Sequence, residues 1–129
     1  MDKRNVPRPT DAELAILRVL WGRGPSTVRE VQKELNRERA TGYTTVLKFL
    51  QIMTEKGLVE RDESERTHVY RTRQAEGQTQ RQLIRDLLDR AFGGSALKLV
   101  AQALSARKAS AQELGKIREM LDRYERGDQ

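Results

Sequence analysis

The stretch ATGYTTVLKFLQIMTEKGL, residues 40–58, combines the apolar spacing of a helix with polar residues at its start. Gly57 is a typical helix stop, and the residues expected on the buried face are Val46, Phe49, Leu50 and Met53. The first turn holds two threonines and a tyrosine, which are indifferent helix formers. Helix propensity therefore does not explain these three residues, whereas contact with another molecule would.

Two further helices are expected before this stretch. Each begins with a Thr-x-x-Glu capping box, first at Thr10 and Glu13 and then at Thr27 and Glu30, in which the side chains satisfy free backbone amides. Glycines at 22 and 24 and a proline at 25 end the first helix, and the second ends near Asn36. The residues expected to be buried are Leu14, Leu17, Val19, Leu20 and Trp21 in the first helix and Val28, Val31 and Leu35 in the second.

A β-hairpin is expected after the third helix. Residues 58–61 and 67–71 are short β-rich runs, and the charged segment 62–66 separates them. The order helix–helix–helix–hairpin is that of the winged variant of the helix-turn-helix, a mainly α fold with a small β-hairpin. In that fold the helix within residues 40–58 is the recognition helix.

A recognition helix that enters the major groove explains the polar first turn. Threonine hydroxyls can contact bases or phosphates, and free amides at a helix N-terminus favour a phosphate. The residues expected to contact DNA are Arg39, Thr41, Tyr43, Thr44, Thr45, Lys48 and Arg66, the last at the tip of the wing. The alternative is that Thr44 and Thr45 merely cap a surface helix.

Composition agrees with a polyanionic partner and argues against catalysis. The 129 residues include 25 Lys and Arg against 19 Asp and Glu, a net charge of +6, and a basic balance favours nucleic acid. The sequence has no cysteine and one histidine, His68, so it has no thiolate metal site or His-based pair. Without a glycine-rich phosphate loop either, no catalytic site, metal or cofactor is expected.

Length and hydropathy predict a soluble protein with one core, or with one small core and an appendage. No apolar run of 18 residues occurs, and the segment MDKRNVPRPT lacks the apolar stretch of a signal peptide. The expected location is therefore the cytoplasm. The expected organisation is a flexible basic arm (residues 1–9), a winged-helix DNA-binding domain (10–73) and a helical dimerisation domain (74–129).

The C-terminal third is expected to form helices over residues 74–92, 95–104 and 110–124. Ser95 and a third capping box at Ser110 and Glu113 begin the last two. Leu114, Ile117, Leu121 and Tyr124 follow steps of three, four and three, the narrow seam of a helix that meets a partner helix. The predicted dimer contacts are these four with Leu87, Phe92 and Leu99, unless the seam folds back on its own winged helix.

Several motifs resemble the penicillinase-repressor family, which includes methicillin-resistance and copper-responsive repressors. They are Thr10-Asp11-Ala12-Glu13-Leu14, Val19-Leu20-Trp21, Thr27-Val28-Arg29-Glu30-Val31, Tyr43-Thr44-Thr45-Val46, Lys56-Gly57-Leu58-Val59 and His68-Val69-Tyr70. The resemblance covers roughly residues 9–124, and the Tyr-Thr-Thr-Val tetrapeptide is its most specific part. It implies a homodimeric repressor that binds a palindromic operator and negatively regulates transcription.

The chain departs from this family at three places. Ile52 stands where many relatives carry arginine, so one DNA contact is expected to be missing or replaced by packing. The cysteine cluster of copper-responsive relatives is absent. Gln102-Ala103 replaces the Asn-Phe bond that a sensor protease cuts in antibiotic-responsive relatives, which questions regulation by that cut.

Two other functions remain open at this point. The first is a winged-helix protein–protein interaction module without specific DNA binding, which steeply salt-dependent operator binding would exclude. The second is an RNA-binding regulator, which competition between duplex DNA and RNA would test.

Overall fold

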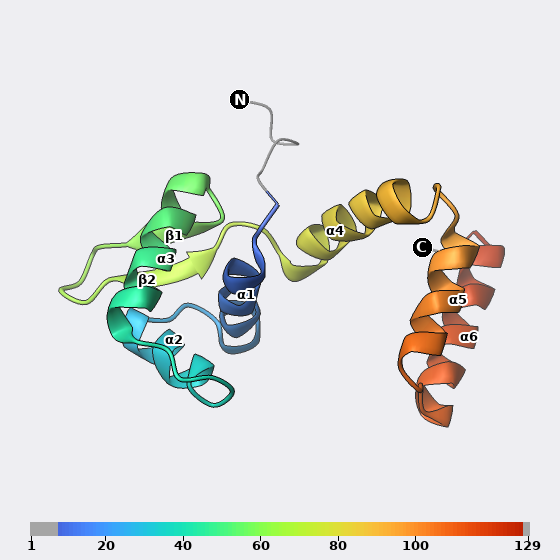
Figure 1. Cartoon of the computed structure of the whole chain (residues 1–129), viewed down its shortest axis with the longest axis horizontal. Helices are drawn as coiled ribbons and strands as arrows, with labels where there is room; N and C mark the ends of the chain where they lie inside the picture. Colours follow the sequence, from blue (N-terminus) through green and yellow to red (C-terminus); the bar gives the residue numbers. More distant parts are fainter. Residues whose placement is uncertain (1–7, 128–129) are drawn as a thin grey trace. The chain divides into compact units, whose positions relative to one another are not determined.

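The computed structural model describes residues 8–127, which form six helices and one hairpin (Figure 1). The elements are α1 (Asp11–Arg23), α2 (Val28–Leu35), α3 (Tyr43–Lys56), β1 (Val59–Asp62), β2 (Val69–Thr72), α4 (Glu76–Ala91), α5 (Ala96–Ala106) and α6 (Ala111–Glu125). Of the predicted basic arm, residues 1–7 lie outside the described part, and Pro9 is buried. The chain divides into two compact units, the first ending at Ile84 and the second beginning at Arg85. The predicted winged helix-turn-helix is confirmed in the first unit.

The core of the N-terminal unit joins one face each of α1, α2 and α3 to the base of the hairpin. The buried apolar residues are Ile16, Leu17, Leu20, Val28, Val31, Val46, Leu50, Met53, Leu58, Val59 and Tyr70. The predicted stripe of α1 was right for Leu17 and Leu20, whereas Leu14, Val19 and Trp21 are only partly buried. The buried face of α1 consists of positions 13, 16, 17 and 20, which have helical spacing. An apolar pattern does not reveal this face, because position 13 is a glutamate.

The hairpin is fastened to the segment that connects α1 and α2. β1 and β2 pair antiparallel, with Val59 opposite Thr72 and Asp62 opposite Val69. The amide of Ser26 donates to the Tyr70 carbonyl at 2.9 Å, and the Tyr70 amide donates back to the Ser26 carbonyl at 2.8 Å. Because the buried Tyr70 ring also belongs to the core, the base of the wing has a fixed position relative to the helices.

The N-terminal unit continues past the predicted boundary at residue 73. The Trp21 indole Nε1 donates to the Gln74 carbonyl at 3.1 Å, and Thr79 in α4 is buried. These contacts hold the start of α4 against the end of α1, so the compact unit ends within α4. A boundary placed at the end of the hairpin leaves out this first part of α4.

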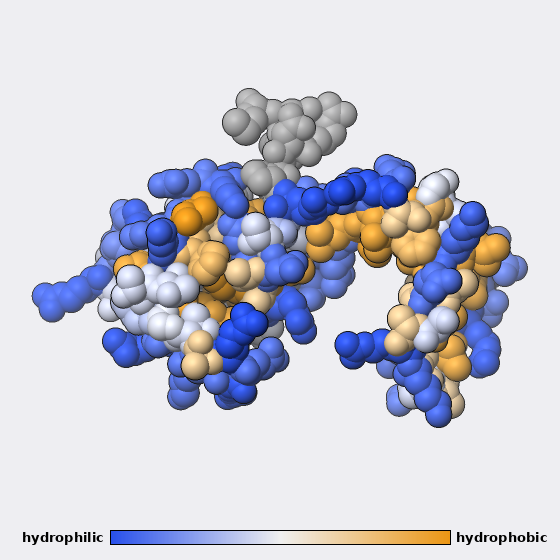
Figure 2. Space-filling view, viewed as in Figure 1, coloured by the Kyte–Doolittle hydropathy of each residue, from blue (hydrophilic) through white to orange (hydrophobic). Residues whose placement is uncertain are grey.

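The C-terminal unit leaves much of its apolar surface exposed. Ser95 and Ser110 cap α5 and α6 by accepting from the amides of Lys98 and Glu113. The third predicted capping box thus forms only half, because no reciprocal bond from the Ser110 amide to the Glu113 side chain is found in residues 8–127. No described residue of α5 or α6 is buried, and Figure 2 shows apolar surface over both helices. Within residues 8–127, no helix is long and apolar enough to cross a membrane.

An ion pair between an exposed lysine and a buried carboxylate joins the start of α1 to the end of α3. The Glu13 side chain is 2 % exposed, and its Oε2 lies 2.8 Å from Lys56 Nζ. Its Oε1 accepts from the Thr10 amide at 2.9 Å, which completes the predicted capping box. Burial alone would raise the pKa of this carboxyl, but the hydrogen bonds from Lys56 and Thr10 hold the pKa below its ordinary 4.5.

The substitution Lys56→Met is expected to destabilise the fold by about 1–3 kcal/mol, because a charge-assisted bond to a buried carboxylate is lost. Urea unfolding at neutral pH measures this change. Lys48→Met is the matched control, since Lys48 is an exposed lysine of the same helix with no ion pair in the described chain. Equal stability of the two variants would contradict a stabilising role for the pair.

Acid should remove the same contribution. Because the folded-state pKa of Glu13 is lowered, its ionised form stabilises the fold above about pH 4.5 and loses this effect as the pH falls through the folded-state value. Glu13→Gln keeps the shape of the side chain without its charge. From about pH 6 to about pH 3, the unfolding free energy of this variant should therefore fall less than that of the unaltered chain.

Candidate nucleic-acid interface

The start of α3 lacks the side-chain cap found at the other helices whose N-caps are described. Its N-cap is Gly42, which makes no side-chain bond, whereas threonine or serine caps α1, α2, α5 and α6. Thr44 and Thr45 lie inside the first turn and are exposed. The alternative that these threonines cap the helix is therefore wrong. The first amides of α3 have no side-chain acceptor within the described chain.

One face of α3 is exposed along its first half. Val46, Leu50 and Met53 are buried in the core, so the opposite face, which carries Thr44 and Lys48 one turn apart, is exposed. In Figure 2 the start of α3 shows pale surface, neither strongly hydrophilic nor hydrophobic. Ile52, one turn beyond Lys48, is half-buried.

The loop before α3 is held by hydrogen bonds that centre on Thr41. Its amide donates to Asn36 Oδ1 at 2.6 Å, its carbonyl accepts from Gln32 Nε2 at 3.1 Å, and its hydroxyl donates to the Arg39 carbonyl at 3.0 Å. Thr41 thus has a structural part in the loop. The Arg39 side chain in this loop is exposed and has no ion pair within residues 8–127.

The turn of the wing carries both paired and unpaired charged residues among those that the structure describes. Asp62 Oδ1 accepts from the Ser64 amide at 2.9 Å, and this bond lowers the pKa of Asp62. Arg61 pairs with Glu63 at 2.6 Å. Arg66 is exposed, and the described chain holds no ion pair for it.

Several basic residues of the N-terminal unit are engaged by carboxylates of the same chain. Ion pairs within the chain engage Arg23, Arg37, Lys56, Arg61, Arg71 and Arg73. In contrast, the basic residues predicted to contact DNA have no acidic partner within residues 8–127. These residues are Arg39, Lys48 and Arg66.

Arg29 belongs to this face, although sequence reasoning did not select it. Its guanidinium carbon lies 5.2 Å from the centroid of the Tyr43 ring, a cation–π contact worth about 0.5–1 kcal/mol at an exposed site. One signal in the sequence was present: Arg29 stands in the first turn of α2, where the helix dipole disfavours a cation. Its pairing with Tyr43, 14 positions later, has no local pattern.

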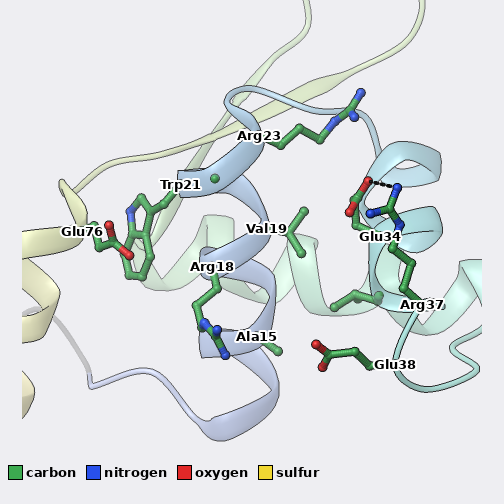
Figure 3. A pocket seen from close by; sticks show the side chains of 11 residues that line it. Ala15, Arg18, Val19, Trp21, Arg23, Glu34, Arg37, Glu38 and Glu76 are labelled. Carbon is green, nitrogen blue, oxygen red and sulfur yellow. Dashed lines mark ion pairs between the residues drawn. The ribbon is translucent and has the colours of Figure 1, made fainter. Parts of the chain in front are cut away.

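Two hollows lie on the N-terminal unit, and their charges differ. One, of about 660 Å³, lies beside α1, the end of α2 and Glu76 (Figure 3). It is lined by three arginines and three glutamates, and Arg37 and Glu34 in it pair at 3.5 Å. The other, of about 500 Å³, lies between α2, α3 and the hairpin and has no carboxylate in its lining. Its residues are Thr27, Val28, Arg29, Tyr43, Leu47, Arg66, Thr67, His68 and Tyr70.

Known proteins resemble the whole chain or parts of it. The penicillinase repressor of Bacillus licheniformis is 23 % identical over 121 residues, which cover 94 % of each chain. The transcriptional regulator BlaI of Mycobacterium tuberculosis is 41 % identical over 61 residues, 46 % of this chain and 44 % of that one. The solution structure of monomeric Bacillus licheniformis BlaI in complex with the blaP half-operator is also similar. Its TM-score is 0.50 at 27 % identity, and the match covers 57 % of this chain and 89 % of that one.

These relatives are repressors and regulators of transcription, which are not enzymes. A model of one family describes nearly the full length of the sequence, from residue 9 to residue 123. The motifs that carried the resemblance all fall within this range. The chain belongs to the penicillinase repressor family.

Proposed function

We propose that this chain represses transcription by binding duplex DNA through the start of α3, the loop before it and the wing, as a homodimer on a palindromic operator. The observation that carries this proposal is the uncapped start of α3, which is bordered by cations without acidic partners. The relative solved with a half-operator supports DNA as the ligand. Catalysis has no part in this function.

The uncapped turn suits a phosphate, and the exposed threonines suit base edges. Free amides and the positive end of the helix dipole attract an anion. Thr44 and Thr45 then offer hydroxyls and methyl groups to the major groove. Lys48, one turn further along, and Arg39 and Arg66 on either side each neutralise a phosphate. Steep dependence of binding on salt follows from such contacts.

Exposed apolar residues support dimerisation through the C-terminal unit. Of the predicted contacts, Leu87, Leu121 and Tyr124 are exposed, and Phe92, Leu99, Leu114 and Ile117 are half-buried. Further exposed apolar residues, absent from the prediction, are Leu97, Val100, Leu104 and Met120. Leu97 is 81 % exposed. A second copy of the chain would cover this surface, because contiguous apolar surface of this kind marks protein interfaces.

Specific binding should depend on the two threonines. Thr44→Ala or Thr45→Ala is expected to cost about 1–3 kcal/mol at the operator, because a contact to a base edge is lost. Titrations would use a duplex selected from genomic fragments and, as the control, a random duplex of equal length. Binding to the random duplex should stay nearly unchanged. Equal weakening on both duplexes would exclude these residues as readers of sequence.

A cap introduced at Gly42 should separate stability from DNA binding. The backbone there has φ −74°, and an added Cβ would have Thr45 Oγ1 at 3.9 Å as its near neighbour, so a side chain fits. Gly42→Asp should raise the free energy of unfolding by a few tenths of a kcal/mol, while its carboxylate repels the phosphate. The expected result is a more stable protein that binds all duplexes weakly.

Gly42→Ser is the matched control, because it supplies a cap without charge and should weaken binding less. Thermal unfolding and duplex titration of the same samples measure both effects. A Gly42→Asp protein that is folded and binds DNA as tightly as the unaltered chain would exclude a phosphate at this helix end.

Operator affinity should also depend on the C-terminal apolar surface. Replacing Leu97 and Leu121 with glutamine should yield monomers and lower operator affinity by about 10²-fold or more, because linkage of two half-sites is lost. Sedimentation and operator titration on the same samples test this, with Lys116→Gln as an exposed control on α6. A folded monomeric variant that binds a full operator like the unaltered chain would exclude the dimer.

A further inference from the structure

We propose that the hollow between α2, α3 and the hairpin holds one backbone phosphate of the bound duplex, and that Tyr43 positions Arg29 for this contact. This inference rests on the proposed function and adds a site that the threonines, Lys48 and Arg39 do not include. Two arginines from different elements, Arg29 and Arg66, line the hollow together with His68.

The charge of the lining selects an anion. Arg29 and Arg66 contribute positive charge to the hollow, and none of the nine lining residues is acidic. Neither arginine has an ion pair within the described chain. The hollow beside α1 is comparable in size, but its lining holds as many glutamates as arginines, so its formal charges balance. Of these two hollows, the one between α2, α3 and the hairpin leaves a net positive charge for a ligand.

The contact between Arg29 and Tyr43 prepares the guanidinium for a phosphate. An exposed arginine ordinarily samples many rotamers, and fixing them on binding costs conformational entropy. The Tyr43 ring, 41 % exposed, holds the guanidinium carbon at 5.2 Å from its centroid. In such a stack the N–H groups at the edge stay free, and their fork fits phosphate oxygens. Tyr43 thereby lowers the ordering cost that Arg29 would pay when DNA binds.

The position of the hollow favours a phosphate of the duplex over a free anion. Tyr43 is the first residue of α3 and immediately precedes Thr44 on the exposed face. Arg66 lies in the turn of the wing. The hollow therefore continues the surface proposed to meet DNA, where a strand that passes the start of α3 brings its own phosphates.

The salt dependence of DNA binding tests this site without knowledge of the operator. The logarithm of the binding constant for a mixed-sequence duplex would be measured against the logarithm of salt concentration for the full chain. Arg29→Ala should reduce the slope by about 0.9, the value for one phosphate contact. Arg18→Ala is the matched control, because Arg18 is an exposed arginine without an ion pair in the described chain and lines the charge-balanced hollow. Its slope should not change.

Tyr43 variants separate a positioning role from a direct one. Tyr43→Phe keeps the ring and should keep both the slope and the affinity. Tyr43→Ala should weaken binding, and adding Tyr43→Ala to Arg29→Ala should weaken it no further, because both act on one contact. Independent, additive losses in the double variant would overturn the positioning role.

A neutral phosphate analogue locates the contact on the DNA. In a selected operator duplex, single methylphosphonates would replace one phosphate at a time. The methylphosphonate at the phosphate that Arg29 contacts should weaken binding of the unaltered chain. The same methylphosphonate should not weaken binding of Arg29→Ala. Loss of the same size in both proteins at every position would overturn the site.

The outcomes distinguish this inference from the function on which it rests. If the unaltered chain does not bind duplex DNA, the proposed function fails. If the unaltered chain binds but Arg29→Ala behaves like Arg18→Ala, only the phosphate site fails. Inorganic phosphate would also be titrated at constant ionic strength without DNA, with the Arg29 side-chain NMR signal as readout. Saturation at low millimolar phosphate would instead identify a site for a free anion.

Discussion

The ion pair between Glu13 and Lys56 links the start of α1 to the end of α3 and, together with the core, fixes which face of α3 is exposed. The buried stripe Val46, Leu50 and Met53 sets which face of α3 lies against the core. The pair adds a polar constraint at the far end, because a buried carboxylate without its cation is strongly unfavourable. Rotation of α3 about its axis would break both. Thr44 and Lys48 are thereby kept on the exposed face.

Ion pairs also determine which cations of the N-terminal unit keep an uncompensated charge. Cations near the core or along the hairpin are engaged by carboxylates of the chain, as in the pairs of Arg23 with Glu30 and of Arg71 with Glu60. Exposed pairs of this kind contribute little to stability, but they remove positive charge from those surfaces. Among the described residues, α3, its preceding loop and the wing keep basic residues without ion pairs, namely Lys48, Arg39 and Arg66.

Local patterns in the sequence predicted the elements well, whereas contacts between distant residues were missed. The capping boxes at Thr10 and Thr27, the helix stop at Gly57 and the hairpin depend on residues within a few positions of one another. Glu13 with Lys56, Trp21 with Gln74 and Ser26 with Tyr70 join residues that are 43 to 53 positions apart. No periodicity encodes such pairs. For the candidate site, the sequence predicted the polar first turn of α3. It did not predict Arg29, because the contact of Arg29 with Tyr43 depends on how α2 packs against α3.

The hydrogen bond from Trp21 to Gln74 gives the protein an intrinsic fluorescent probe of this contact. Trp21 is the single tryptophan of the sequence, so the fluorescence of the chain comes mainly from one indole. That indole is half-buried and bonded to the segment that leads into α4, the helix in which the first compact unit ends and the second begins. Any rearrangement that pulls α4 away from α1 would therefore change the polarity around one chromophore. Emission from the unlabelled protein can therefore follow the contact between α1 and the segment that leads into α4 while the chain binds a ligand.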